Sequence, residues 1–470
     1  MNPVTSRPAI VWFRDDLRVA DNPALRAAAA GGRPVLALYV LDDDSKGIRA
    51  LGGASRWWLA GSLRTLAQNL ARTGLTLTLR RGRAADVVRE LARRSDAAAV
   101  HWNRRYGHAA ASDNRIEQDL RADGVDVATF NGSLLFEPGA VRTKSGGTPR
   151  VFTPFWRMAL ASGEPRAPSS APKQIEAFGG VTGENLADWK LEPAAPDWAG
   201  GLRATWQRGE NAAKNRLADF IDHSLQGYAA ERERPDIDST SRLSPYLRFG
   251  EISPHQVWRA ATAAQERGDA NAHDVEKFLA ELGWREFSYH LLQQFPDLAT
   301  RNFQSRFDAF PWRAEEKLLL RWQRGETGYP IVDAGMRQLW HTGFMHNRVR
   351  MVVASFLVKH LLIDWREGER WFWDTLVDAD PANNPASWQW VAGSGADAAS
   401  YFRVFNPTLQ GEKFDPDGDY VRRWVPELAH LPAASMHQPT PVEAPDYPAP
   451  VVDHAKARAR ALDAFASLKA

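Results

Sequence analysis

Apolar residues in the first 130 positions fall in short runs that are separated by longer amphipathic stretches. Five runs have the length of buried strands. They lie at residues 9–13, 35–41, 75–79, 97–102 and 125–130. Ala-rich stretches of helical character lie between them, near residues 22–30, 55–73, 84–94 and 109–123. Strands that alternate with helices are typical of a parallel, doubly wound sheet. The first strand is not followed by GxGxxG, so the usual dinucleotide-binding fingerprint is missing from this part.

Helical periodicity dominates from about residue 206 to the end of the chain, where residues 454–468 form a last predicted helix. Before it, residues 161–173 are rich in Pro, Ser and Ala, which predicts an exposed connector, and a short helix is expected at 151–160. We therefore predict three parts. They are an α/β domain at 1–133, an interdomain linker at 134–205 and a larger all-α domain at 206–470.

Composition narrows the class of protein. A chain of 470 residues with 44% hydrophobic and 25% charged residues is typical of a globular protein of two or three domains. It has no Cys, which excludes disulfides, thiolate metal sites and Cys nucleophiles and is consistent with a cytoplasmic location. No signal peptide is visible at the start. The longest apolar run, 351–362, is interrupted by Lys359 and His360, so no membrane span is expected.

The formal net charge is only +2, from 59 basic and 57 acidic residues. A nucleic-acid-binding surface would therefore have to be local. The Arg residues near positions 80–83 are best interpreted as a solvated surface. Ten of the 19 Trp lie between Trp284 and Trp424. Some of these Trp are expected in the hydrophobic core, but so many Trp also suit a protein that stacks on flat rings or transfers electrons.

The most informative segment is 378–415, which combines acids, paired Asn and two Trp within a Gly-, Ala- and Pro-rich run. Small residues let the backbone approach a flat ligand closely, and the Trp offer stacking faces. Residues 240–244 (TSRLS) add three hydroxyls and a guanidinium before Pro245, a combination that can hold a phosphate. The alternative interpretation of residues 240–244 is an ordinary helix N-cap. The alternative interpretation of residues 378–415 is a helical segment of the core.

Two further motifs have helical spacing. In 278–287 (FLAELGWREF), the side chains that share one helical face are Phe278, Glu281, Trp284 and Arg285. In 345–351 (MHNRVRM), one face carries Asn347, Arg350 and Met351, whereas Arg348 is expected to point elsewhere and to contact phosphate. Amphipathic core helices are the alternative for both. His341 and His346 are five residues apart, which does not suit a metal pair, so we expect no metal site.

These motifs together closely resemble the DNA photolyase/cryptochrome family. The resemblance covers nearly the whole chain, because WFRDDLR at 12–18, DNPAL at 21–25 and DYPAPVVDHAKAR at 446–458 also match. It implies an N-terminal α/β domain with a doubly wound parallel sheet, followed by a larger all-α domain that binds FAD. It also implies a light-driven enzyme that is active with reduced FAD.

Site residues follow from the same resemblance. The implied FAD contacts are Tyr228, Thr240, Ser241, Arg242, Leu243, Ser244, Phe278, Arg285, Asn347, Arg350, Asp378, Ala379, Asp380 and Asn384. The implied DNA and lesion contacts are Arg232, Glu281, Trp284, Arg285, Asn347, Arg348, Met351 and Trp390. Glu281, Met351 and Asn384 form the implied catalytic set, in which Asn384 faces the central-ring nitrogen of the flavin. Asp378 is expected to pair with Arg350, and Trp388, Trp365 and Trp312 match a three-Trp electron relay.

The implied reaction is the repair of cyclobutane pyrimidine dimers in ultraviolet-damaged DNA. Relatives that repair 6-4 photoproducts carry His at the positions of Asn347 and Met351, which favours the cyclobutane dimer as the substrate. Ala379 and Pro381 depart from the commonest family pattern and suggest the class III branch, near plant cryptochromes. The alternatives are a cryptochrome-type photoreceptor, which Asn384 and the intact lesion set disfavour, and a non-catalytic nucleotide-binding module. We expect a monomer.

The resemblance also implies an antenna pigment in the first domain, and 5,10-methenyltetrahydrofolate is the expected molecule. Trp57, Trp58, Trp102 and Tyr106 are aromatic residues that could enclose a flat ring, although Trp57 and Trp58 are better interpreted as core. Gly107 stands where folate-binding relatives often carry Glu. The pterin N–H groups would then need another acceptor.

Overall fold

The computed structural model describes residues 7–143, 146–398 and 402–469. Its α/β part contains one parallel sheet with the strand order β3-β2-β1-β4-β5. The strands are β1 (Ala9–Phe13), β2 (Val35–Leu41), β3 (Leu77–Arg81), β4 (Ala99–Asn103) and β5 (Asp126–Phe130). This confirms the predicted doubly wound sheet. β3 and β4 each begin two residues later than predicted, because their pairing starts only at Leu77 against Ala37 and at Ala99 against Ala9.

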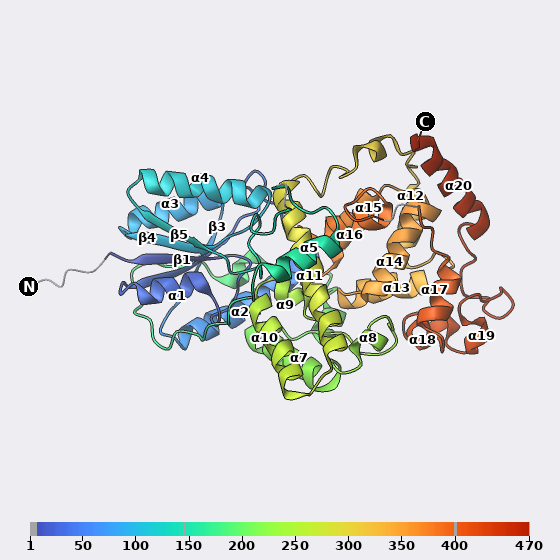
Figure 1. Ribbon diagram of the computed structural model, residues 1–470, viewed down its shortest axis with the longest axis horizontal. Helices are drawn as coiled ribbons and strands as arrows, with labels where there is room; N and C mark the ends of the chain where they lie inside the picture. Colours follow the sequence, from blue (N-terminus) through green and yellow to red (C-terminus); the bar gives the residue numbers. More distant parts are fainter. Residues whose placement is uncertain (1–6, 144–145, 399–401, 470) are drawn as a thin grey trace, which may run out of the picture.

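Helices cover both faces of the sheet. Figure 1 shows α1 (Pro23–Ala30) and α2 (Gly53–Ala71) on one face and α3 (Ala84–Arg94) and α4 (His108–Ala122) on the other. The chain moves outward from β1 to β3 and then crosses back to β4. Right-handed crossovers therefore place the two helix pairs on opposite sides. Because both faces are buried, β1 and β2 are continuous apolar runs rather than alternating ones.

All regular structure described from Gly200 onward is helical, which confirms the predicted larger all-α part (Figure 1). Its helices are α6 (Gly200–Thr205), α7 (Glu210–His223), α8 (Tyr228–Glu231), α9 (Ser244–Arg248), α10 (Pro254–Arg267), α11 (Ala272–Gln294), α12 (Glu316–Arg324), α13 (Pro330–Thr342), α14 (Asn347–Ser355), α15 (Trp365–Thr375), α16 (Asn383–Ala392), α17 (Pro407–Phe414), α18 (Asp419–Trp424), α19 (Ala433–Met436) and α20 (His454–Ala466). No helix of the described residues is long and apolar enough to cross a membrane.

The predicted short helix in the linker is present as α5 (Phe152–Ala161), which Figure 1 shows lying across α11. Beyond it, residues 163–172 form neither helix nor strand, as their Pro-rich composition predicts. The connector nevertheless returns to the sheet, where Val35 N–H donates to the Glu176 carbonyl at 2.7 Å. The proposed bounds of the three parts stay a prediction.

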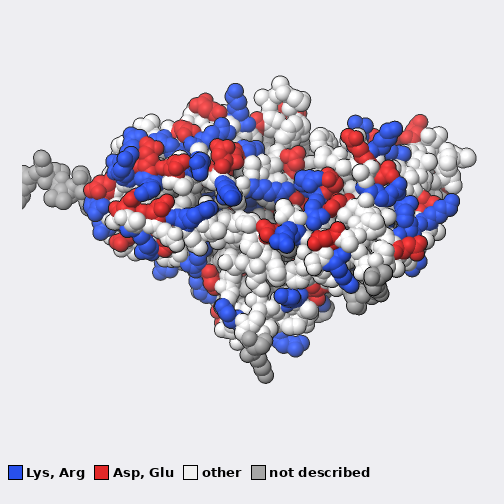
Figure 2. All heavy atoms as spheres, turned by 90° about the horizontal axis from the view of Figure 1, so that it is seen from above, with Lys and Arg blue, Asp and Glu red and all other residues white. Residues whose placement is uncertain are grey.

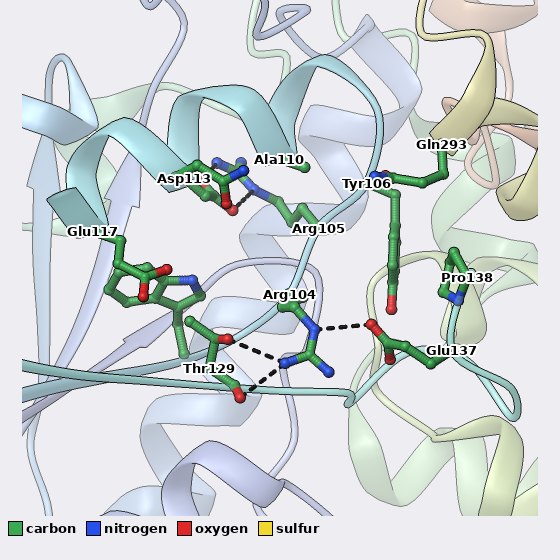
Figure 3. Close-up of a pocket in the computed structure, with 12 residues that line it drawn as sticks. Arg104, Arg105, Tyr106, Ala110, Asp113, Glu117, Thr129, Glu137, Pro138 and Gln293 are labelled. Carbon is green, nitrogen blue, oxygen red and sulfur yellow. Dashed lines mark hydrogen bonds and ion pairs between the residues drawn. The ribbon is translucent and has the colours of Figure 1, made fainter. Parts of the chain in front are cut away.

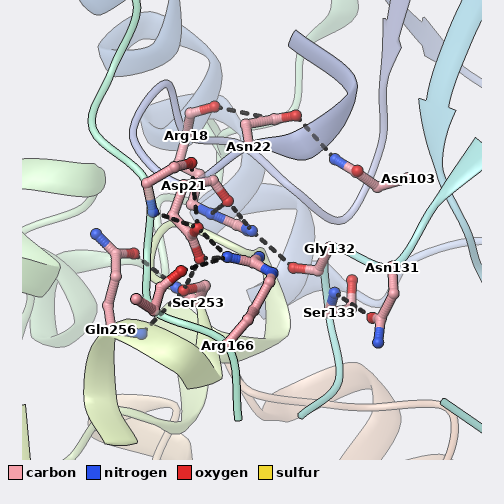
Figure 4. A network of polar contacts seen from close by, with 12 residues as sticks. Arg18, Asp21, Asn22, Asn103, Asn131, Gly132, Ser133, Arg166, Ser253 and Gln256 are labelled. Carbon is pink, nitrogen blue, oxygen red and sulfur yellow. Dashed lines mark hydrogen bonds and ion pairs between the residues drawn. The ribbon is translucent and has the colours of Figure 1, made fainter. Parts of the chain in front are cut away.

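Motif residues near the end of β1 join the two domains. Figure 4 shows Asp21 facing Arg166 of the connector and Ser253 of the helical part. Arg18 donates to the carbonyl of Gly250 at 2.9 Å and to that of Gly132 at 2.6 Å. Although burial alone would raise the pKa of Asp21, the hydrogen bonds from Arg166 and Ser253 lower it. This network fixes the α/β part against the helices.

Candidate functional site

One cavity of about 560 Å³ in the helical part gathers the predicted site residues. All fourteen residues of the implied FAD set line it, and so do all eight of the implied lesion set. Its volume lies in the range of about 300–1,000 Å³ that is typical of ligand sites. The role of each residue stays a prediction, but the resemblance located one continuous site.

The loop at 240–244 forms one end of this cavity. Arg216 fixes it, because its guanidinium donates to the Thr240 carbonyl at 2.7 Å and to the Ser241 carbonyl at 2.9 Å. Ser244 does not cap α9, and its hydroxyl instead donates to Asp378 Oδ2 at 2.6 Å. The N-cap alternative is therefore wrong for Ser244. Sequence reasoning missed Arg216, which comes from α7 and belongs to no motif.

Asp378 is a buried carboxylate in which only one of the two oxygens accepts hydrogen bonds from the described residues. Arg350 Nη2 donates to Oδ2 at 2.8 Å, which confirms the predicted pair, and Arg350 Nε donates to the Met345 carbonyl at 2.7 Å. Asp378 Oδ1 is buried and has no hydrogen-bond partner among the described residues. A buried acceptor without a donor is unfavourable, so this atom fits a ligand that carries an N–H or O–H group.

Asn384 is held by a chain that begins in the other domain. Its Nδ2 donates to the Glu369 carbonyl at 3.1 Å and to Glu369 Oε1 at 2.8 Å. Arg49 pairs with the same carboxylate at 2.6 Å. With both amide hydrogens directed to Glu369, Asn384 Oδ1 is left as an acceptor. An acceptor that faced the central nitrogen of a flavin, as predicted for Asn384, would suit the reduced cofactor, whose nitrogen carries a hydrogen.

Asp380 is held by a hydroxyl and by backbone amides. Tyr289 Oη donates to Asp380 Oδ2 at 2.7 Å, and Oδ1 accepts from the N–H groups of Ala382 and Asn383. Burial, together with the charge of Asp380, raises the pKa of Tyr289 well above its usual value, so the hydroxyl keeps its hydrogen at neutral pH. Tyr289 was missed, although it follows Arg285 by four residues on α11 and the Arg285 guanidinium lies 4.9 Å from its ring centre.

The predicted face of α11 is confirmed, since Phe278, Glu281, Trp284 and Arg285 all line the cavity. Glu281 forms an ion pair with Arg232 at 2.6 Å. The Trp284 ring is stacked on Phe152 with 3.7 Å between ring centres. Phe152 belongs to α5 and was not predicted to lie near the site. Trp390 lines another part of the cavity and donates its indole N–H to the Asp397 carbonyl at 3.0 Å.

Arg348 was expected to point away from the face of Asn347, Arg350 and Met351. All four residues line the cavity, but Arg348 has partners of its own, and its contact with phosphate stays a prediction. Arg348 is at the first turn of α14, where it pairs with Glu233 and lies 4.3 Å from the Phe414 ring centre. No group of three or more potential metal ligands occurs among the described residues.

The three predicted relay Trp lie in or against one hydrophobic cluster. Trp388 lines the cavity, and its ring is so close to Gly368 that a Cβ there would lie 2.1 Å from it. Trp365 begins α15, one turn before Gly368, and is fully buried. Trp312 is half-buried at the edge of the cluster. This arrangement is compatible with a path from the cavity toward the surface, and the relay stays a prediction.

A buried acid next to Arg285 leads to a prediction on stability. Burial raises the pKa of Glu286 to about 7, whereas an unfolded Glu titrates near 4.5. The unfolded state therefore loses this proton first, and the folded state loses stability as pH rises from about 4.5 to 7. We expect Glu286→Gln to remove this loss. It should be more stable than the wild type at pH 8 by on the order of 2 kcal/mol, with a smaller difference at pH 5, in urea denaturation of the flavin-loaded protein.

Glu276→Gln is the matched control, because Glu276 lies exposed on the same helix. It should leave the pH dependence unchanged. If Glu286→Gln shows the wild-type dependence, Glu286 is not the group that titrates.

The aromatic residues considered for an antenna separate into two groups. Trp57 and Trp58 are at most 1% exposed, and Trp58 packs against Trp206 and Tyr246, so both belong to the core as the sequence favoured. Trp102 and Tyr106 line a separate pocket of about 140 Å³. In Figure 3 the Tyr106 hydroxyl and the Glu137 carboxylate point toward one another across it. This pocket is smaller than usual ligand sites.

Charged side chains of both signs lie interspersed on the face of the molecule shown in Figure 2. The arginines that line the cavity are Arg232, Arg242, Arg248, Arg285, Arg348 and Arg350. A positively charged surface that binds DNA would therefore be confined to the surroundings of the cavity.

Known proteins resemble this chain along nearly its whole length. Residues 9–173 match the family model of DNA photolyase, and residues 278–467 match that of the FAD binding domain of DNA photolyase. A deoxyribodipyrimidine photo-lyase of Agrobacterium fabrum is 52% identical, with 98% of each chain covered. Cryptochrome-1 of Arabidopsis thaliana is 37% identical over 98% of this chain and 70% of its own length.

The fold agrees with these sequence matches. The crystal structure of a bacterial class III photolyase from Agrobacterium tumefaciens superposes with a TM-score of 0.95 at 51% identity, covering 100% of this chain and 99% of that one. The helical part is accordingly the FAD-binding part. The chain belongs to the DNA photolyase family.

Proposed function

We propose that this protein is a light-driven lyase that repairs cyclobutane pyrimidine dimers in ultraviolet-damaged DNA, with reduced FAD as its cofactor. The observation that carries the proposal is the single cavity in which the implied cofactor residues and the implied lesion residues meet. Photolyases flip their target nucleotides out of the duplex, and this cavity offers the necessary concave site. The 52% identity to a deoxyribodipyrimidine photo-lyase supports the same conclusion.

When bound in its reduced form, FAD would supply a light-excited electron for the opening of the dimer and would take it back afterwards. The chain's own residues position the two partners. Asp378, Asp380 and Asn384 present acceptors for the flavin, each fixed by a neighbouring side chain. Trp284 and Trp390 offer stacking faces for the lesion, and Glu281 offers a carboxylate within an ion pair. Asp378, Asp380 and Asn384 are buried, which keeps water from the flavin side of the cavity.

The residues at two positions specify the substrate. Asn347 and Met351 line the cavity where relatives that act on 6-4 photoproducts have His. A neutral amide and a thioether do not transfer protons near neutral pH, whereas His does. We therefore propose the cyclobutane dimer as the substrate. The close match to a class III photolyase supports assignment to that branch.

A cryptochrome-type photoreceptor is the second candidate, because a plant cryptochrome matches 98% of this chain. The higher identity to a photo-lyase and the complete lesion set favour repair. We further propose that the protein acts as a monomer in the cytoplasm, where bacterial DNA lies. The folate antenna stays a prediction, since the described pocket beside Tyr106 is small.

Blue light is expected to convert cyclobutane dimers in an oligonucleotide to intact pyrimidines in the presence of the flavin-loaded, reduced protein. The same conditions should leave a 6-4 photoproduct unchanged, because Asn347 and Met351 replace His. Product formation can be followed by the recovery of absorbance near 260 nm and by chromatography. A dark reaction is the control. Light-induced spectral changes without any loss of dimer would favour the photoreceptor.

A further inference from the structure

One face of Trp284 is already covered. The Phe152 ring lies nearly parallel to it, with 3.7 Å between ring centres and 10° between the planes. Two stacked aromatic rings cannot admit a third ring between them at this distance. A pyrimidine dimer can therefore stack only on the opposite face of Trp284, and the orientation of that face depends on Phe152.

Phe152 is itself held in place. Its ring packs against Trp156 of the same helix and against the edge of Phe287 on α11, and only 9% of the residue is exposed. The two helices approach closely at Gly283, where a Cβ would lie 2.7 Å from the Trp156 ring. Gly283 directly precedes Trp284. A larger side chain there would push α5, and Phe152 with it, away from α11.

The second stacking residue is held separately. Trp390 lines the same cavity and donates its indole N–H to the Asp397 carbonyl at 3.0 Å.

We propose that Phe152 is a positioning residue that sets the orientation of the Trp284 ring in the cavity. The preference for damaged over undamaged DNA then depends on α5, a helix that lies in the predicted linker. This inference rests on the proposed function. It adds to that site a residue that lies outside the helical part and that influences lesion preference. Phe152 acts through Trp284 and does not touch the lesion.

The test is a double-mutant cycle of Phe152→Leu and Trp284→Ala, read as the ratio of affinities for dimer-containing and undamaged DNA. Phe152→Leu keeps an apolar side chain but removes the ring. Aromatic pairs are worth about 0.5–1.5 kcal/mol, so we expect the ratio to fall by about three- to tenfold. In the Trp284→Ala background, Phe152→Leu should change the ratio by less than about twofold, because nothing is left to orient.

Phe155→Leu is the matched control. Phe155 lies on the same helix and is fully buried, but its ring packs against Phe287 and His290 instead. It should lower stability without lowering the ratio. FAD content and melting temperature are measured for each variant, so that general loosening of α5 is recognised.

Three outcomes overturn the inference. The first is a wild-type ratio in folded, flavin-loaded Phe152→Leu. The second is an equal loss in the presence and absence of Trp284. The third is the same loss in Phe155→Leu. A wild-type protein that shows no preference for dimer-containing DNA would instead refute the proposed function, and the inference with it.

Discussion

Light-driven reduction of the oxidised flavin is expected to stop in Trp388→Phe, whereas dimer repair continues after the flavin of this variant is reduced chemically. Trp388 is the one residue of the predicted relay that lines the cavity. A Phe ring preserves most of the packing against Phe372 but is much harder to oxidise than indole. The absorbance of oxidised flavin near 450 nm under blue light, followed by a repair assay in the presence of dithionite, measures both halves of the prediction.

Trp322→Phe is the matched control, because Trp322 is also fully buried and its ring centre lies 6.2 Å from that of Trp388. The oxidised flavin of Trp322→Phe should lose its absorbance in blue light as fast as that of the wild type. Trp365→Phe and Trp312→Phe should slow the bleaching if the relay follows the predicted order. Normal photoreduction in Trp388→Phe would mean that the electron enters the cavity through another residue.

Removal of the Arg350 charge is expected to cause the largest loss of cofactor. Arg350→Met leaves Asp378 as a buried carboxylate whose remaining donor is Ser244. Removing one partner of a buried ion pair typically costs about 3–5 kcal/mol. Since Arg350 itself is a quarter exposed, we expect the lower end of this range. FAD affinity should fall by at least about a hundredfold, as measured by fluorescence titration of the flavin-depleted protein.

Arg337→Met provides the comparison, because Arg337 pairs with Glu427 at 2.8 Å and does not line the cavity. Its exposure, 22% for the side chain, is close to that of Arg350. It should bind FAD with the wild-type affinity. An equal loss in both variants would show that stability, rather than the carboxylate in the cavity, controls binding.

The fold was predictable because its signals are local. Strands buried on both faces are continuous apolar runs, so β1 and β2 were predicted to the residue. The starts of β3 and β4 were not, since a neighbouring strand decides where pairing begins. The expected 454–468 helix ends instead at Ala466, followed by a 3₁₀ turn, because helix ends are weakly encoded.

The site was predictable where spacing along one helix determines it, as for the face of α11 that carries Glu281 and Trp284. Arg348 belongs to the first turn of α14 and lines the same cavity, and its role stays a prediction. Supporting residues were missed for a different reason. Phe152 lies 132 residues from Trp284, and no periodicity in a sequence connects two such distant segments.

The chain from Arg49 through Glu369 to Asn384 has an implication for how the family can change. Arg49 belongs to the α/β part, yet its charge fixes the carboxylate that orients the Asn384 amide in the cavity. With Asn384 at the flavin, as predicted, the redox properties of the cofactor would depend partly on the first domain. A change in that domain would then have to preserve this cation for the cavity to keep its chemistry.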